Sequence, residues 1–166
     1  PMQWTPDRNA GFSTADPGKL YLPVVQSLVF NYTLVNVESQ LAQSRSLLHW
    51  VRNVIHVRKG HPTFGLGGMR VLPTNHESVL AFVREYEGSG QQFGDAPERV
   101  LCVFSFSHNP VSVRIDVGEP GSALYDLFGG GEFPSIGDDG TVTLTLATQS
   151  FYWLHVGEVR YQPTAF

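Results

Sequence analysis

One amphipathic helical segment stands alone before a long region of strand-like alternation, and this contrast most constrains the fold. Residues 46–59 place apolar groups on one helical face: Leu47, Leu48, Val51, Val54 and Ile55, with the stem of Arg58. Gly60 and Pro62 end the pattern. Because a single helix has to bury its apolar stripe against another layer, we expect a barrel or sheet that this chain lacks to cover it.

The region before this helix follows neither the helical nor the strand period. Residues 1–34 are rich in Pro, Asn, Gly, Asp and aromatic residues, which predicts a long structured loop. Such loops are usually functional or belong to a larger scaffold. Asn36 is a good N-cap for a short helix through Gln43. Motif-like residues follow directly after Pro1, and this favours the interpretation that the chain is a fragment.

From Phe64 the period of the apolar residues changes to two. Turn clusters of Gly, Pro, Asn and Asp separate the strand-like runs, which cover residues 69–72, 78–86, 99–107, 111–117, 123–128, 141–146 and 151–156. Strands at this spacing predict a mainly β fold, an antiparallel β-sandwich. A module of about a hundred residues can bury its own core. We therefore expect two parts, residues 1–62 and 63–166.

Composition and charge exclude several classes of protein. Hydrophobic residues make up 42% of the chain and charged residues 16%, which is a globular balance. The net charge is -4 and the 11 Lys and Arg residues are scattered, so we expect no nucleic-acid surface. No apolar stretch is long enough to span a bilayer and no signal peptide opens the chain, so we expect a cytoplasmic protein without membrane contact. Cys102 lies in an apolar run, and we expect a buried, inert thiol.

The sequence contains no convincing set of residues for a metal site, a nucleotide site or a catalytic pair of carboxylates. His49 and His56 share a helix face but have no Asp, Glu or Cys nearby to complete a zinc shell, so we expect no metal site. The glycine runs at residues 64–68 and 129–131 lack the strand–loop–helix order of a nucleotide fingerprint and are interpreted as turns. Glycoside hydrolysis needs two carboxylates about 5 Å apart for retention. The 15 acidic residues are dispersed and offer no such pair.

The run at residues 113–117 imitates a glycosidase nucleophile motif. Asp116 stands two residues after Arg114, as the nucleophilic Asp stands after an Arg in many retaining α-glycosidases. Here, however, the run lies among sandwich strands between two turn clusters. We expect simple alternation, with Val113, Ile115 and Val117 inward and the two charged residues in solvent.

The amino-terminal loop is the remaining candidate site. It combines aromatic, amide and charged side chains as a sugar-facing loop would, in the candidate residues Gln3, Trp4, Asp7, Arg8, Asn9 and Phe12. Aromatic faces stack on sugar C–H groups, and amides and carboxylates bind hydroxyls. A structural loop pinned by Trp4 and Phe12, with a local Asp7–Arg8 ion pair, explains the same composition. The residues alone leave both interpretations open.

The start of the chain resembles a known family. Pro1-Met-Gln-Trp4 followed by Asn9-Ala-Gly-Phe-Ser13 is similar to the segment after the eighth barrel strand in the α-amylase superfamily, glycoside hydrolase family 13. The whole run of residues 1–13 resembles the trehalose synthases (maltose α-D-glucosyltransferases). Similar matches occur at residues 20–23, 35–38, 46–48, 57–59, 61–62, 78–84 and 151–153.

The resemblance implies a division of labour between this chain and a longer parent. Residues 1–62 would be the last loop and helix of a catalytic (β/α)8 barrel, and residues 63–166 an α-amylase-type C-terminal domain. The parent would interconvert maltose and trehalose through a covalent glucosyl-enzyme, with some hydrolysis on the side. The catalytic carboxylates of the family precede Pro1, so we expect no catalytic residue here. The candidate loop residues would support or line the pocket.

The resemblance also sets expectations for ligands and partners. Maltose and trehalose would bind the parent's barrel, this chain would hold no cofactor, and a Ca²⁺ site would lie upstream. A homo-oligomer or a contact with a maltose kinase is compatible with the family. Two alternatives stay open: a hydrolytic α-glucosidase or α-amylase parent, and an autonomous carbohydrate-binding or interaction module. The platform of that module would be Tyr86, Phe93, Tyr125, Phe133 and Tyr161.

Overall fold

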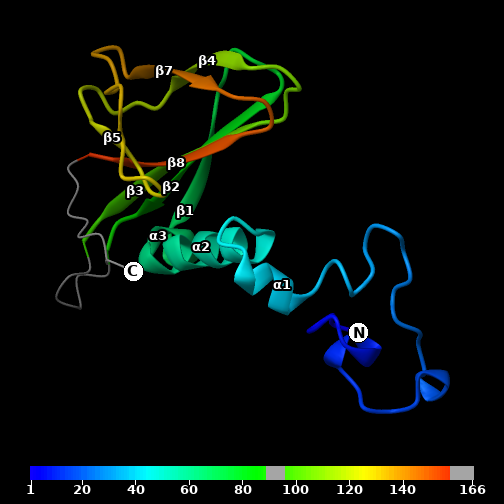
Figure 1. Cartoon of the computed structure of the whole chain (residues 1–166). Coiled ribbons are helices and arrows are strands. Elements are labelled where there is room, and N and C mark those ends of the chain that lie inside the picture. The colour runs from blue at the N-terminus through cyan, green and yellow to red at the C-terminus, as the bar shows by residue number, and fades with distance from the viewer. Residues whose placement is uncertain (89–95, 158–166) are drawn as a thin grey trace. The chain divides into compact units, whose positions relative to one another are not determined.

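The computed structural model describes residues 1–88 and 96–157. The chain divides into two compact units, Pro1–His56 and Val57–Phe166, and each is considered by itself (Figure 1). The predicted domain boundary after Pro62 stays a prediction. Within the described ranges, no helix is both long and apolar enough to cross a membrane.

The first unit is a long loop followed by helices. Two short 3-10 turns, Arg8–Gly11 and Pro17–Lys19, interrupt the loop before helix α1, Val37–Ala42. The predicted N-cap is confirmed, because Asn36 Oδ1 accepts the Ser39 N–H at 2.8 Å. Helix α2, Leu47–Gly60, begins in this unit and confirms the predicted helix within one residue.

Apolar side chains of the first unit are mostly exposed. Among residues 1–56, all of which are described, Ala10 is the one buried hydrophobic residue. Tyr21 is 98% exposed and Leu28 is 91% exposed. In α2 the predicted apolar stripe is open as well, with Leu47 68% exposed. The first unit therefore has no hydrophobic core of its own.

The second unit is an antiparallel β-sandwich, which confirms the predicted fold class. A six-stranded sheet has the order β1-β2-β3-β8-β5-β6, and the two-stranded sheet β4-β7 faces it (Figure 1). The strands are β1 Gly68–Leu72, β2 Val79–Tyr86, β3 Glu98–Ser105, β4 Val111–Asp116, β5 Leu124–Asp126, β6 Glu132–Phe133, β7 Thr141–Leu146 and β8 Phe151–Val156. The seven predicted strands all form, each end within two residues of its prediction.

The sandwich core forms where alternating strand residues of both sheets meet. Strand β4 shows the pattern best, because Val113 and Ile115 are fully buried while the residues that alternate with them along the strand are exposed. Arg114 forms an ion pair with Asp139, their nearest atoms 2.6 Å apart. The motif at residues 113–117 is thus a core strand with solvent-facing charges, as the alternation predicts.

The outer face of the six-stranded sheet carries a second apolar cluster. Val57 from the end of α2 is 8% exposed and packs there, although it lies outside the predicted helix stripe. The cluster also contains Val100, Cys102, Leu127, Phe64, Phe82, Phe104, Phe128 and Trp153. Burial raises the pKa of the Cys102 thiol to about 12, so this thiol stays protonated and unreactive.

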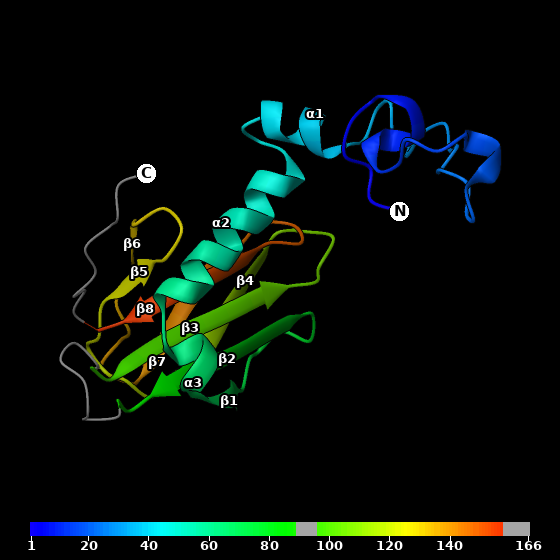
Figure 2. The same cartoon turned by 90° about the horizontal axis from the view of Figure 1, so that it is seen from below.

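A one-turn helix, α3 (Thr63–Leu66), lies against β2 and β3 and was missed by the sequence pattern (Figure 2). The glycine run at 64–68 was interpreted as a turn, but its first three residues are helical. Arg84 of β2 fixes this helix by donating hydrogen bonds to the carbonyl oxygens of Thr63, Phe64 and Gly67, the last at 2.7 Å. One turn is too short to show a helical period, and a distant arginine stabilises it.

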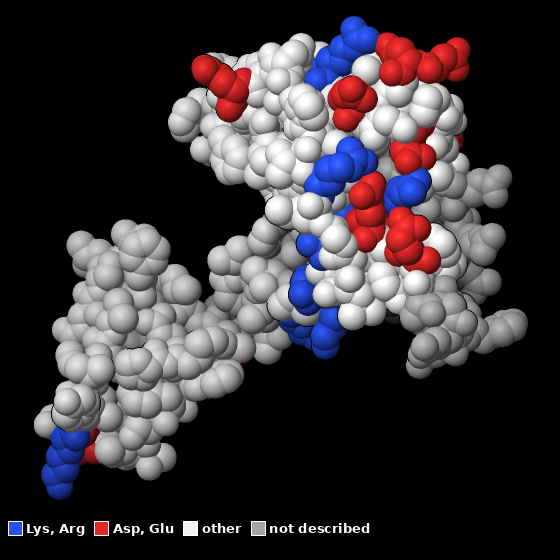
Figure 3. Space-filling model, turned by 180° about the vertical axis from the view of Figure 1, so that it is seen from behind, with Lys and Arg blue, Asp and Glu red and all other residues white. Residues whose placement is uncertain are grey.

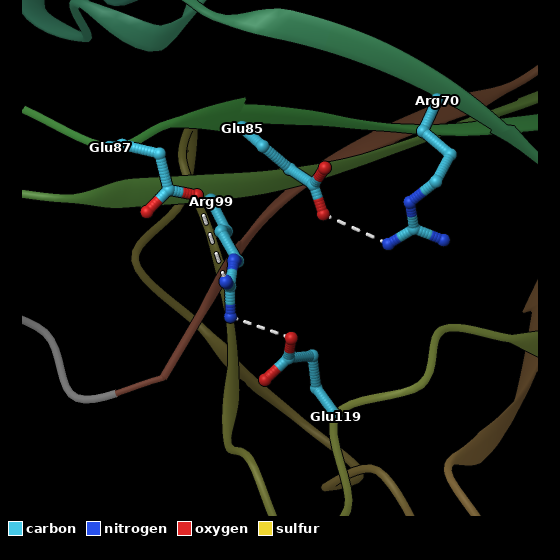
Figure 4. Close-up of polar contacts among 5 residues, drawn as sticks. All are labelled: Arg70, Glu85, Glu87, Arg99 and Glu119. Atoms are coloured by element: carbon cyan, nitrogen blue, oxygen red, sulfur yellow. Dashed lines mark hydrogen bonds and ion pairs between the residues drawn. The ribbon is translucent and has the colours of Figure 1, made fainter.

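Charged side chains on the sandwich are paired with opposite charges. Arg70 contacts Glu85 at 2.9 Å, and Arg99 contacts Glu119 at 2.6 Å and Glu87 at 4.0 Å (Figure 4). Figure 3 shows acidic and basic groups interspersed on one face. Partly exposed pairs of this kind contribute little to stability, about 0–1 kcal/mol each.

Gly67→Ala will destabilise the second unit because there is no room for a β-carbon. A Cβ at residue 67 would lie 2.6 Å from the Glu85 carbonyl oxygen and 2.7 Å from that of Thr63. We expect the free energy of unfolding to fall by about 1–3 kcal/mol in urea denaturation. Gly65→Ala is the matched control, because nothing lies within 4 Å of its Cβ position. It should raise stability by up to about 1 kcal/mol, and equal losses in both variants would contradict this account.

Candidate functional site

The candidate loop is built around a left-handed turn. Asn9, Ala10 and Gly11 have φ angles of 57°, 55° and 70°, respectively. This conformation is easy for Gly, tolerated by Asn and costs Ala roughly 1–2 kcal/mol. Backbone hydrogen bonds close the turn, because Ala10 N–H donates to Asp7 O and Trp4 N–H to Ala10 O, each at 2.9 Å. Strained backbone of this kind often occurs at functional sites.

Asn9 is a buried clamp for the loop. Its side chain is well covered, since the residue is 3% exposed. The amide Nδ2 donates to Ser13 O at 3.0 Å and to Ala15 O at 2.8 Å. Because both amide hydrogens are already bound to backbone, Asn9 holds the loop shape and offers no donor to a ligand.

Gln3 also holds the shape of the loop through side-chain hydrogen bonds to backbone carbonyl oxygens. Its Nε2 donates to the carbonyl oxygens of Phe30, at 3.3 Å, and Val35. The backbone beside it pairs with the start of α1, since Val37 N–H donates to Gln3 O at 2.9 Å. Gln3 therefore ties the beginning of the loop to its end.

The remaining predicted residues are open to solvent or half-buried. Asp7 Oδ2 accepts the Thr5 hydroxyl at 3.0 Å, and Arg8 Nη2 donates to Ala15 O at 3.4 Å. The Asp7–Arg8 ion pair of the structural interpretation is not among the ion pairs found in the described residues. Trp4 is exposed and Phe12 is half-buried.

A hollow of about 660 Å³ lies in this loop. It is lined by Arg8, Gly11, Phe12, Ser13 and Thr14. Two of the predicted residues, Arg8 and Phe12, are thus brought together, while Gln3 and Asn9 frame the loop instead. Gly11, Ser13 and Thr14 were not predicted. The structure shows why residue 11 is a glycine, because a Cβ there would lie 2.5 Å from Thr5 Oγ1.

The chemistry of the hollow suits binding of a polyhydroxylated ligand. A guanidinium, two hydroxyls and a phenyl ring can bind sugar hydroxyls and cover a sugar C–H face. No carboxylate lines the hollow. In the described part of the chain, no group of three or more His, Cys, Asp or Glu residues is arranged to hold a metal ion.

Two relatives of this chain carry the name trehalose synthase. It is 44% identical over 166 residues to "Trehalose synthase/amylase TreS" of Mycolicibacterium smegmatis, covering 99% of this chain and 28% of that protein. It is 45% identical over 157 residues to "Trehalose synthase" of Pimelobacter sp., covering 94% of this chain and 26% of that protein. The chain therefore spans about a quarter of the length of these relatives.

A solved structure shares the fold. The trehalose-6-phosphate hydrolase of Bacillus licheniformis superposes with a TM-score of 0.64 at 19% identity, covering 95% of this chain and 25% of that one. At this identity the likeness concerns the fold alone. It includes the loop as well as the sandwich, because nearly the whole chain is covered.

Asn9 is assigned a clamping role and Ala10 a strained left-handed backbone, so substitutions at these two neighbours should affect hydrogen exchange in the loop differently. Asn9→Ala removes the donor to Ser13 O and Ala15 O, so exchange of the Trp4 amide hydrogen should accelerate about tenfold. Ala10→Gly relieves the left-handed strain and should not accelerate it. Hydrogen exchange measured by NMR tests both variants. Equal acceleration in the two would show that the clamp contributes nothing.

Family profiles divide the chain in the same order as the structure. Residues 1–67 match "Alpha amylase, catalytic domain". Residues 69–153, just over half of the chain, match "Maltogenic Amylase, C-terminal domain". The chain therefore belongs to the α-amylase family, glycoside hydrolase family 13, in which it corresponds to the C-terminal portion of the trehalose synthases that it resembles.

Proposed function

We propose that this chain is the C-terminal part of a trehalose synthase that interconverts maltose and trehalose by retaining, intramolecular glucosyl transfer. The observation that carries this proposal is the 44% identity to a trehalose synthase over 99% of the chain. The identity extends through both units, so it reflects more than a shared C-terminal domain. In this proposal the segment itself is structural and non-catalytic.

The distribution of carboxylates supports a non-catalytic role. Asp7 and Asp16 are the acidic residues of the long loop at residues 1–34. Asp16 Oδ1 accepts the Gly18 N–H at 2.9 Å and so caps a turn. A retaining glycosidase needs two carboxylates about 5 Å apart. Asp7 alone cannot supply them, and the nucleophile and the acid/base would come from the parent's barrel.

The exposed apolar surface of the first unit supports a covering barrel. Tyr21, Leu28 and the stripe headed by Leu47 would be costly to leave in water, at about 25 cal/mol per Å² of apolar area. In the proposed parent, neighbouring barrel elements cover them. The loop would then help to enclose the released glucose, and excluding water favours transfer to the sugar over hydrolysis.

The proposal includes the setting and the ligands of the protein. We place the parent in the cytoplasm, with maltose and trehalose bound in its barrel, no cofactor held by this chain and any Ca²⁺ site upstream. A homo-oligomer or a maltose kinase contact is compatible with it, and we assign this chain no nucleic-acid or membrane partner.

The alternative of an autonomous sugar-binding module has less support. Of its five proposed platform residues, Tyr86, Tyr125 and Phe133 are half-buried. Phe133 packs against Tyr152 on the sandwich core, with ring centroids 4.8 Å apart. Phe93 and Tyr161 lie outside the described residues.

Product analysis separates the isomerase from the hydrolase. The whole protein that carries this chain, incubated with maltose, should form trehalose with a smaller amount of glucose, as chromatography would show. Glucose as the sole product would overturn the proposed reaction in favour of the hydrolytic alternative.

Arg8 provides a test of the loop's part in this reaction. Arg8→Met in the whole protein removes the guanidinium from the hollow, and we expect kcat/KM for maltose to fall about tenfold, the value of a hydrogen bond to a charged donor. The control is Lys19→Met, which removes a charge elsewhere in the loop. Unchanged isomerase and hydrolase rates in Arg8→Met would show that Arg8 has no role in the substrate pocket.

A further inference from the structure

The segment that joins α2 to the sheet, residues 61–67, is held by one buried carboxylate. We call this segment the strap. Glu98 at the start of β3 places Oε1 2.5 Å from His61 Nδ1, and its Oε2 accepts the Thr63 N–H at 3.2 Å. The side chains of His61 and Glu98 are 6% and 14% exposed. A single carboxylate therefore binds two of the first three residues of the strap.

A second imidazole lies beside this pair on the same face of the sheet. His155 of β8 is opposite Val100 of β3, which makes Glu98 its diagonal neighbour. The His155 Nδ1 atom is buried and has no hydrogen-bond partner. Phe64 of the strap packs on Trp153 of the same strand face, with ring centroids 4.5 Å apart.

The unsatisfied polar groups of this region gather at the strap. Within the described ranges, the buried side-chain nitrogen and oxygen atoms without a hydrogen bond are Thr63 Oγ1, Trp153 Nε1 and His155 Nδ1. Thr63 belongs to the strap, and the other two project from β8 beneath it. A buried polar group without a hydrogen bond destabilises the closed state, because it has lost its bond to water. The strap is therefore a place where opening to water regains hydrogen bonds.

We propose that Glu98, His61 and His155 form a pH-sensitive latch, in which the contact of Glu98 with His61 holds the strap on the β-sheet and protonation of the buried His155 releases it before the sandwich unfolds. The proposal concerns the second unit alone and does not depend on the enzymatic activity proposed above.

The charges around His155 give the direction of the pH effect. Burial lowers the pKa of His155 and is the largest effect. The carboxylate of Glu98 raises it part of the way back, His61 lowers it, and the Gly157 backbone raises it slightly. A group with a lowered pKa in the closed state binds its proton more readily once the strap opens. Closure therefore keeps its full stability above the ordinary pKa of 6.5 and loses it as the pH falls below that value.

Other charged or titratable groups lie near the latch, among them Tyr86 of β2, which is opposite Glu98 in the sheet register. Arg84 of β2 stays a cation and holds the strap carbonyls. Tyr125 of β5 is opposite His155 in the sheet register, and Cys102 has a pKa of about 12. Arg58 and Lys59 at the end of α2 are exposed. The direction of the pH response of the latch therefore rests on His155.

Hydrogen exchange can follow the strap separately from the core. Amide hydrogens of Phe64, Gly65 and Gly67 are bonded within the strap, so their protection reports its closure. Between pH 7.5 and pH 5.5, after correction for intrinsic rates, we expect their protection to fall further than that of β4 and β7, because His155 binds its proton more readily once the strap is open. Equal falls in strap and core would overturn the latch.

Two variants identify the groups responsible. His155→Gln should abolish the extra fall of strap protection, whereas His108→Gln, at an exposed turn, should leave it unchanged. An unchanged fall in His155→Gln would overturn the proposal. Glu98→Gln should open the strap at least several-fold even at pH 7.5, because the carboxylate that contacts His61 Nδ1 and accepts the Thr63 N–H is lost.

An NMR titration of His155 provides a measurement that needs no substitution at that residue. Its midpoint should lie below 6.5 in the unaltered protein. In Glu98→Gln the midpoint should fall further, because the carboxylate that raises it is gone. A midpoint that rises in this variant would contradict the proposed latch.

Discussion

Strand β3 packs apolar side chains on both of its faces, and the second unit is organised around this double burial. Leu101 and Val103 face the sandwich core, while Val100 and Cys102 face the outer cluster. All four are fully buried. A strand that is polar on one face needs a single partner layer, but β3 needs two. The β4–β7 sheet covers one face, and the end of α2 with α3 covers the other.

The first unit has no second layer to cover its apolar side chains. Its loop is ordered by hydrogen bonds from Gln3 and Asn9 to backbone carbonyls rather than by an apolar core. Side chains such as Tyr21 and Leu28 remain in solvent. Polar clamps fix the shape of a loop locally, but they do not bury apolar area. The unit is therefore shaped as a partner for another surface, in line with its match to a catalytic-domain family.

The strands were predictable because alternation is a local property of the sequence, and β4 and β7 follow it residue by residue. Helix α3 and the burial of Val57 were not, because both depend on contacts with distant strands. In the candidate loop, two of the residues named from residue types, Arg8 and Phe12, line a hollow, and their part in a substrate pocket stays a prediction. The clamping role of Asn9 needed the left-handed turn, which composition does not reveal.

The position of the strap in the chain also has a consequence for biosynthesis. Its N-terminal anchor Glu98 follows His61 by 37 residues, and its C-terminal anchor Arg84 follows Thr63 by 21. The strap is therefore synthesised before either of its anchors. The end of α2 therefore cannot be fixed to the sandwich until β2 and β3 have emerged and paired. Chain elongation itself thus delays docking of the strap until the strands that anchor it are available.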